Sequence, residues 1–183
     1  EIVAIESHRA GAVVIGEDLG TVPPGVRREL HRRNVLSTRL VLFERVPPER
    51  YPRNAFAAVT THDLPTVAGA LSRSDLTDQA DAGVTPDPDA IDLLRGRLLT
   101  AGGSRAGGSS RAFVLDLHRR LARAPSVLVA ATLDDALGAE RRPNLPGTSG
   151  DQRPNWSIPL PSTLEDIEAD PRVTELTAAL RRT

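Results

Sequence analysis

The sequence contains no cysteine among its 183 residues, which excludes disulfide bonds, thiolate nucleophiles and thiolate metal sites together. The absence of cysteine is compatible with a cytoplasmic location, and we expect the protein to be cytoplasmic. No apolar run reaches the roughly 18 residues that a membrane-spanning helix needs, and the first residues do not resemble a signal peptide. A formal net charge of −1 gives no clustered positive charge, so neither nucleic acid nor a membrane surface is expected as a partner.

Lysine and methionine are absent as well. All 23 basic residues are arginines, which indicates the coding bias of a GC-rich genome rather than selection for bidentate contacts. The chain begins at Glu1 without an initiator and with residues typical of the middle of a fold, so we expect a fragment of a longer protein. The composition, 39% hydrophobic and 26% charged, is that of a globular domain.

Short apolar runs alternate with helical patterns along the chain. Four buried strands are predicted at residues 12–15, 39–43, 55–60 and 126–132. Helices are predicted at residues 26–35, 67–71, 89–99, 111–123 and about 170–182. Buried strands that alternate with helices indicate a parallel α/β sheet, and four such units would be half of an eight-fold barrel.

Three segments carry little apolar periodicity. Residues 72–88 are rich in Asp, Thr and Gly, and residues 101–110 have linker composition, so both are predicted to be mobile loops. Residues 141–161 hold five prolines and the only tryptophan, which predicts an irregular loop that places specific side chains.

Acidic side chains follow two of the predicted strands. Glu17 and Asp18 come after the first strand, and His62 and Asp63 come after the third. In a parallel barrel such positions face one mouth, where catalytic residues collect. Two carboxyls meeting across a cleft suit glycoside chemistry, because one can protonate the leaving oxygen while another stabilises positive charge on the sugar ring.

Other interpretations of these residues stay open at this point. Either acidic motif could be a helix-capping loop whose carboxylates favour the positive end of the next helix dipole. The same acids could serve a metal hydrolase, although no second histidine follows at metal-ligand spacing. We expect His8, His31 and His118 to be solvent-facing or structural. Trp156 could be a core residue, a platform for a sugar, or an anchor for its loop.

Four segments, in this order and spacing, resemble the 4-alpha-glucanotransferases, also called amylomaltases or disproportionating enzymes, of glycoside hydrolase family 77. They are residues 16–23 (GEDLGTVP), 60–66 (TTHDLPT), 143–148 (PNLPGT) and 154–156 (PNW). The resemblance covers residues 12 to about 166, and the lysine-free composition suggests an actinobacterial member.

The resemblance implies a (β/α)8 barrel that moves α-1,4-glucan segments between maltooligosaccharide donors and acceptors by a retaining double displacement, without cofactor or metal ion. Glu17 would be the general acid and base. Asp63 would be the carboxylate that holds sugar hydroxyls and stabilises the oxocarbenium-like state, with His62 donating to the same sugar. Asp18, Asn155 and Trp156 would bind substrate or support the cleft.

The sequence also departs from the family pattern. The family's nucleophilic Asp lies in an Arg-x-Asp motif upstream of the Gly-Glu-Asp-Leu-Gly segment, and nothing at residues 1–11 fits it. Ser157 stands where the family usually has Arg, and Ala70 and Leu71 replace aromatic residues. We therefore expect residues 1–183 to be a single partial catalytic domain, the C-terminal half of a barrel, inactive alone. The alternatives are a non-catalytic α-glucan-binding remnant and an α-amylase-type hydrolase.

Overall fold

The computed structural model describes residues 1–103 and 109–181 of the chain. Its strands are β1 (Ile15–Gly16), β2 (Leu36–Leu40), β3 (Ala55–Ala58) and β4 (Leu128–Val129). Its helices are α1 (Ile2–Ala10), α2 (Val26–Arg32), the 3-10 turn η1 (Pro48–Arg50), α3 (Val67–Ser72), α4 (Ser74–Asp81), α5 (Pro88–Gly102), α6 (Ser110–Leu121), α7 (Leu133–Leu137), α8 (Leu164–Ala169) and α9 (Pro171–Ala179). In these parts of the chain no helix has the length and apolar character that crossing a membrane requires.

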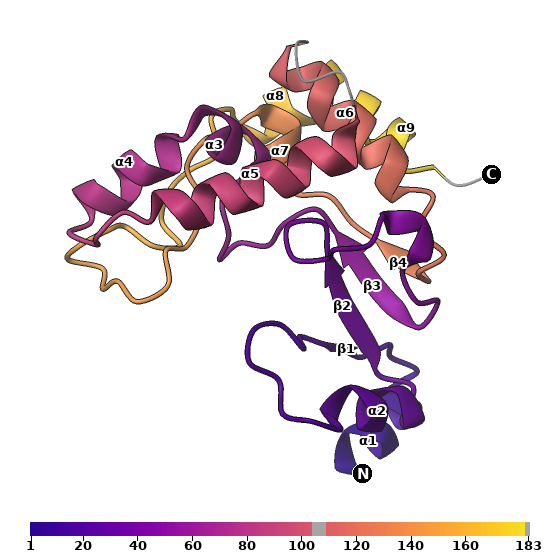
Figure 1. Cartoon of the computed structure of the whole chain (residues 1–183). Helices are drawn as coiled ribbons and strands as arrows, with labels where there is room; N and C mark the ends of the chain where they lie inside the picture. Colours follow the sequence, from indigo (N-terminus) through magenta and orange to yellow (C-terminus); the bar gives the residue numbers. More distant parts are fainter. Residues whose placement is uncertain (104–108, 182–183) are drawn as a thin grey trace.

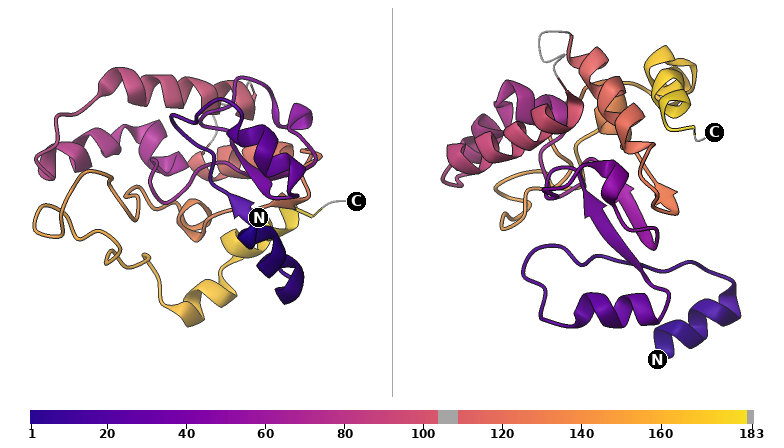
Figure 2. Two further views of the ribbon diagram at one scale, coloured as in Figure 1. Left: turned by 90° about the horizontal axis from the view of Figure 1, so that it is seen from below. Right: turned by 45° about the vertical axis from the view of Figure 1, so that its right-hand side comes forward.

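The four strands form one parallel sheet in the order β1-β2-β3-β4 (Figure 1). This confirms the expected α/β fold with four parallel strands. The outer strands β1 and β4 are short, and each has a single neighbour. Helices α1 and α2 lie at the end of the molecule where β1 is, while α3–α9 gather at the opposite end (Figure 2).

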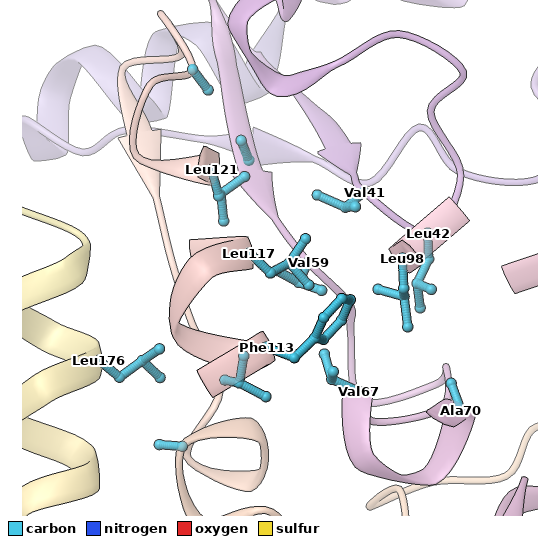
Figure 3. Packing of buried hydrophobic residues seen from close by; sticks show 14 of the residues in the cluster. Val41, Leu42, Val59, Val67, Ala70, Leu98, Phe113, Leu117, Leu121 and Leu176 are labelled. Atoms are coloured by element: carbon cyan, nitrogen blue, oxygen red, sulfur yellow. The ribbon is translucent and has the colours of Figure 1, made fainter. Parts of the chain in front are cut away.

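The hydrophobic core lies between the sheet and the helices that follow β3. Side chains alternate between the two faces of a strand. In β3, Ala57 belongs to the core with Phe113, Leu117 and Leu98 (Figure 3), while Phe56 and Ala58 line a cavity. Helices α3, α5, α6, α7 and α9 therefore pack over one face of the sheet, and the other face lines the cavity.

Several predicted elements differ from the structure, among them the strand predicted at 126–132, which is shortened to Leu128–Val129. The strands predicted at 12–15 and 39–43 lie instead at Ile15–Gly16 and Leu36–Leu40. Val41 and Leu42 are buried, as the apolar pattern requires, but the chain already turns there. Residues 72–88 are not a mobile loop, because they contain helix α4. The other predicted loop lies partly outside the described residues, which resume at Ser109, the N-cap of α6.

The helix predicted near residues 170–182 is present as α9, and α8 precedes it without having been predicted. Thr163 caps α8 by accepting a hydrogen bond from the Asp166 N–H, a start signal that is visible in the sequence. The irregular segment 141–161 contains no helix or strand, as predicted from its prolines.

Candidate functional site

The site begins at the carboxyl ends of the parallel strands, which share one edge of the sheet. Glu17 directly follows β1, and the turn with His62 and Asp63 follows β3. A pocket of about 360 Å³ opens here, and both Glu17 and His62 line it. This volume lies within the range typical of small-molecule sites.

The pocket combines an apolar floor with a polar rim, the usual character of a site that binds and orients a small molecule. Its floor is the uncovered face of the sheet, and its rim comes from Thr38 of β2 and from the segments after β1, β3 and β4. The floor includes Ile15, Phe56 and Ala58, and the rim includes Glu17, Thr38, Thr60, Thr61, His62, Thr132, Asp134 and Asp135. Asp63 is not among the lining residues in the part of the chain that the structure describes.

Glu17 is exposed at this rim. Within residues 1–103 and 109–181 its carboxylate makes no hydrogen bond or ion pair. A carboxyl group of this kind is available to a ligand in the pocket, both as a proton donor and as a proton acceptor.

Asp63 is held in place by a segment about eighty residues further along the chain. Its Oδ1 accepts a hydrogen bond from Asn144 Nδ2 at 2.7 Å, and His62 Nε2 lies 3.4 Å from the same oxygen. Arg142 Nη1 donates to the Asp63 main-chain carbonyl at 2.8 Å. The Asn144 N–H donates to the His62 carbonyl at 3.1 Å, so both residues of this turn are tied to the 141–161 loop.

Trp156 reaches the same turn from the far end of that loop. Its ring centroid lies 4.7 Å from that of His62 with the planes tilted by 50°. The side chain is 65% exposed, so Trp156 is not a core residue. Its φ of 62° is a left-handed backbone angle that a bulky residue rarely adopts. Strained backbone of this sort clusters at binding sites, where it presents a side chain.

Asn155 anchors the loop internally. Its Oδ1 accepts from the Leu145 N–H at 3.1 Å and from Arg153 Nη1 at 2.8 Å, while Nδ2 donates to Thr148 Oγ1 at 2.8 Å. These bonds join residues 145–148 of the loop to residues 153–155. Asn155 therefore supports the loop through its side chain.

Asp18 is buried, unlike its neighbour Glu17, and it fastens the segment after β1 to β2. Its carboxylate accepts hydrogen bonds from Ser37 Oγ at 2.6 Å, from the Thr38 N–H at 2.7 Å and from Arg27 Nε at 2.9 Å. Burial by itself would raise the pKa of Asp18, but these three hydrogen bonds and the charge of Arg39 outweigh it and lower the pKa. Asp18 thus stays ionised and supports the site.

The acidic side chains Glu17, Asp18 and Asp63 do not cap the helices that follow them. Helix α2 starts after Gly25 without a side-chain cap, and α3 is capped by Thr66, whose Oγ1 accepts from the Gly69 N–H at 3.0 Å. The capping interpretation of Glu17 and Asp63 is therefore wrong. Among the described residues no group of three or more His, Asp or Glu side chains could hold a metal ion.

Two of the three histidines outside the motifs face solvent, and the third, His118, lies at the pocket. His8 and His31 are exposed, and His118 is fully buried with Nδ1 2.8 Å from the Val114 carbonyl. Burial lowers the pKa of His118 and outweighs that contact.

The sequence analysis missed several residues that build this site: Asp75, Asp78, Asp135, Arg142, Asn144 and Arg153. Asn144 lies inside one of the four motifs, so its position was a usable signal. The others come together only through contacts between segments distant in sequence.

Residues 1–164 match the family described as Glyco_hydro_77: 4-alpha-glucanotransferase. A 4-alpha-glucanotransferase of Mycobacterium tuberculosis is 41% identical over 207 residues, which cover 98% of this chain and 28% of that protein. One from Haemophilus influenzae is 30% identical over 198 residues and covers 91% of this chain and 27% of that protein. The chain thus spans little more than a quarter of the length of these relatives.

Two solved structures resemble this chain in fold. The crystal structure of amylomaltase from Corynebacterium glutamicum matches with a TM-score of 0.82 and 32% identity, over 100% of this chain and 30% of that one. Amylomaltase from Streptococcus agalactiae in complex with acarbose matches in fold with a TM-score of 0.63 at 16% identity, over 97% of this chain and 33% of that one.

Proposed function

This chain belongs to the 4-alpha-glucanotransferase family. We propose that it supplies the general acid and base, and the charge-stabilising carboxylate, of a reaction that transfers α-1,4-glucan segments between maltooligosaccharides. The observation that carries the proposal is the contrast between Glu17, which lines the pocket and has no partner among the described residues, and Asp63, which Asn144 orients in the turn after β3. No metal ion or organic cofactor takes part in the proposed reaction, and we place it in the cytoplasm.

Glu17 would protonate the leaving glycosidic oxygen and then accept the proton of the incoming acceptor hydroxyl. This task needs a carboxyl that can exchange protons with the substrate, and the Glu17 side chain is exposed at the pocket with no partner within residues 1–103 and 109–181. In a retaining mechanism a second carboxylate attacks the sugar. We expect that nucleophile from a segment that these 183 residues do not contain.

Asp63 would hold sugar hydroxyls and stabilise positive charge that develops on the ring. A preorganised carboxylate is effective for this purpose because it does not have to reorient as the charge forms. The 2.7 Å bond from Asn144 to Oδ1 supplies that orientation, and among the described residues Oδ2 has no hydrogen-bond partner, so it would face the sugar. His62 would donate to the same sugar, and the exposed ring of Trp156 would pack against a sugar face.

The test is a chimera in which this chain replaces the aligned segment of the Mycobacterium tuberculosis relative. We expect it to convert maltotriose into glucose and a ladder of longer oligosaccharides. Glu17→Gln should lower kcat by about 10²- to 10⁴-fold, the contribution typical of general acid–base catalysis. Glu168→Gln, at an exposed position on α8, is the matched control and should leave kcat unchanged.

Two outcomes would contradict the proposal. Products limited to glucose and shortened chains would indicate a hydrolase of the α-amylase type. A folded chimera that binds acarbose without turning over maltotriose would indicate a glucan-binding remnant.

A further inference from the structure

Helix α4 carries an unusual buried polar face. Asp75 is 1% exposed, and Asp78 and Gln79 are each 7% exposed. Burying a carboxylate is costly unless it is paired and hydrogen-bonded. The partners lie in the 141–161 loop, which runs beside α4 (Figure 1).

Asp75 and Arg142 form a bidentate ion pair. Arg142 Nε donates to Oδ1 at 2.8 Å and Nη2 donates to Oδ2 at 2.5 Å, and both side chains are at least nine-tenths buried. Gln79 Nε2 adds a third bond to Oδ2 at 2.7 Å. Because the guanidinium is a rigid planar fork, a carboxylate that holds two of its nitrogens also fixes the direction of the third.

That third nitrogen, Nη1, is the one that donates to the Asp63 carbonyl at 2.8 Å. One guanidinium therefore joins α4, the loop and the strand-end turn. Two residues further on, Asn144 bonds the Asp63 carboxylate, so the place of Arg142 also determines the place of that amide. Arg153 is held by Asp78 and donates to the Arg142 carbonyl at 2.5 Å. This bond fixes the backbone between Arg142 and Asn144.

A buried ion pair of this kind is a poor way to gain stability, because desolvation offsets most of the attraction. What the ion pair supplies here is a fixed orientation of the Arg142 guanidinium. We propose that Arg142, oriented by Asp75, is a positioning residue that sets the place of the Asp63 carboxylate in the glucan-transfer reaction. This inference rests on the proposed function of Asp63.

The kinetic test uses the chimera with Arg142→Lys, because lysine keeps the charge but cannot bond Asp75 twice and Asp63 at once. We expect kcat for maltotriose to fall by about 10- to 100-fold, the order of loss that a misplacement of about 1 Å can cause, with KM within about threefold. Arg111→Lys, at the exposed pair with Glu175, controls for the substitution and should leave kcat unchanged. Leu98→Val, a buried core change away from the site, controls for lost stability.

A folded Arg142→Lys chimera whose kcat stays within about twofold of the parent would overturn the inference while leaving the proposed function intact. A fall in thermal stability without a fall in kcat, as expected of the Leu98→Val control, would likewise make Arg142 merely structural.

A second measurement decides the geometry independently of turnover. In ¹⁵N-labelled samples of the chimera, Arg142→Lys should shift the Asn144 side-chain amide and the Asp63 main-chain amide, whereas Arg111→Lys should move neither. Unchanged resonances at both sites would refute the positioning role even if the chimera were inactive. Shifted resonances with an inactive parent chimera would support the role and remove the proposed function.

Discussion

Asp135 gives a stability prediction whose size follows from the structure. Its Oδ1 accepts a hydrogen bond from the Val67 N–H, the first N–H of α3, at 2.8 Å. Its Oδ2 is buried and has no partner among residues 1–103 and 109–181. Burial raises the pKa of Asp135 to about 6, against the lowering effect of the bonds with Val67 and Thr132.

An acid with a raised folded-state pKa stabilises the fold at low pH. Below about pH 4 both the folded and the unfolded chain hold the proton, and above about pH 6 both have lost it. Between these values only the folded chain is protonated, so its free energy of unfolding falls as the pH rises. From 3.8 to about 6, at about 1.36 kcal/mol per pH unit, the loss amounts to about 3 kcal/mol.

Asp135→Asn removes this ionisation and keeps an oxygen for the Val67 N–H. The buried amide has its own cost, but that cost is the same at every pH. The parent chain therefore loses about 3 kcal/mol of stability between pH 4 and pH 7, and the variant does not. We expect the free energy of unfolding of the variant, minus that of the parent, to be about 3 kcal/mol larger at pH 7 than at pH 4.

The assay is urea unfolding followed by circular dichroism at both pH values, with Asp151→Asn as an exposed control that should show no such difference. If Asp135→Asn changed the free energy of unfolding equally at pH 4 and pH 7, the carboxyl would not be titrating in the buried state described here, and the reasoning would fail.

Four further substitutions test the packing and the support of the site. Gly69→Ala would place its Cβ 2.3 Å from the Glu140 carbonyl oxygen, so we expect a loss of about 1–3 kcal/mol in thermal unfolding. Gly96→Ala, with open space at its Cβ inside α5, should instead stabilise by up to about 1 kcal/mol. Phe113→Ala should cost about 3–5 kcal/mol in urea unfolding, because the ring is buried in the core. Asp18→Asn should cost about 1–3 kcal/mol at pH 7, measured the same way, because it weakens charge-assisted bonds in a buried position. A change of less than about 0.5 kcal/mol at any of the three buried sites would contradict the contact described for it.

The strand-end motifs could be predicted because they depend on local signals. β3 and the turn with His62 and Asp63 lie where the apolar run and the polar residues after it indicate. The strand predicted at 39–43 lies three residues earlier in the structure. An apolar pattern indicates which residues are buried, but it does not indicate which of them form the hydrogen bonds of a sheet. Val41 and Leu42 are buried, but the chain turns there and they belong to the core under the helices.

Helix α4 could not be predicted for a different reason. Its aspartates make the segment look solvated, and their burial becomes favourable only through arginines more than sixty residues away. The pairing of Asp75 with Arg142 is a tertiary contact, and a local sequence pattern does not predict it. The same holds for Asn144, which lies in a recognisable motif but contacts Asp63 only once the loop has folded against α4.

The two candidate acids are held in opposite ways, and this difference bears on their proposed roles. A group that gives and takes a proton must be able to exchange it with a ligand, whereas one that stabilises charge must be fixed before the charge appears. Glu17 has no partner within the described residues, and Asp63 is held by Asn144 and, through its carbonyl, by Arg142. A purely structural pair of acids would instead resemble Asp18, with every oxygen bonded inward. The contrast between neighbours Glu17 and Asp18 therefore favours a chemical role for the first and a supporting role for the second.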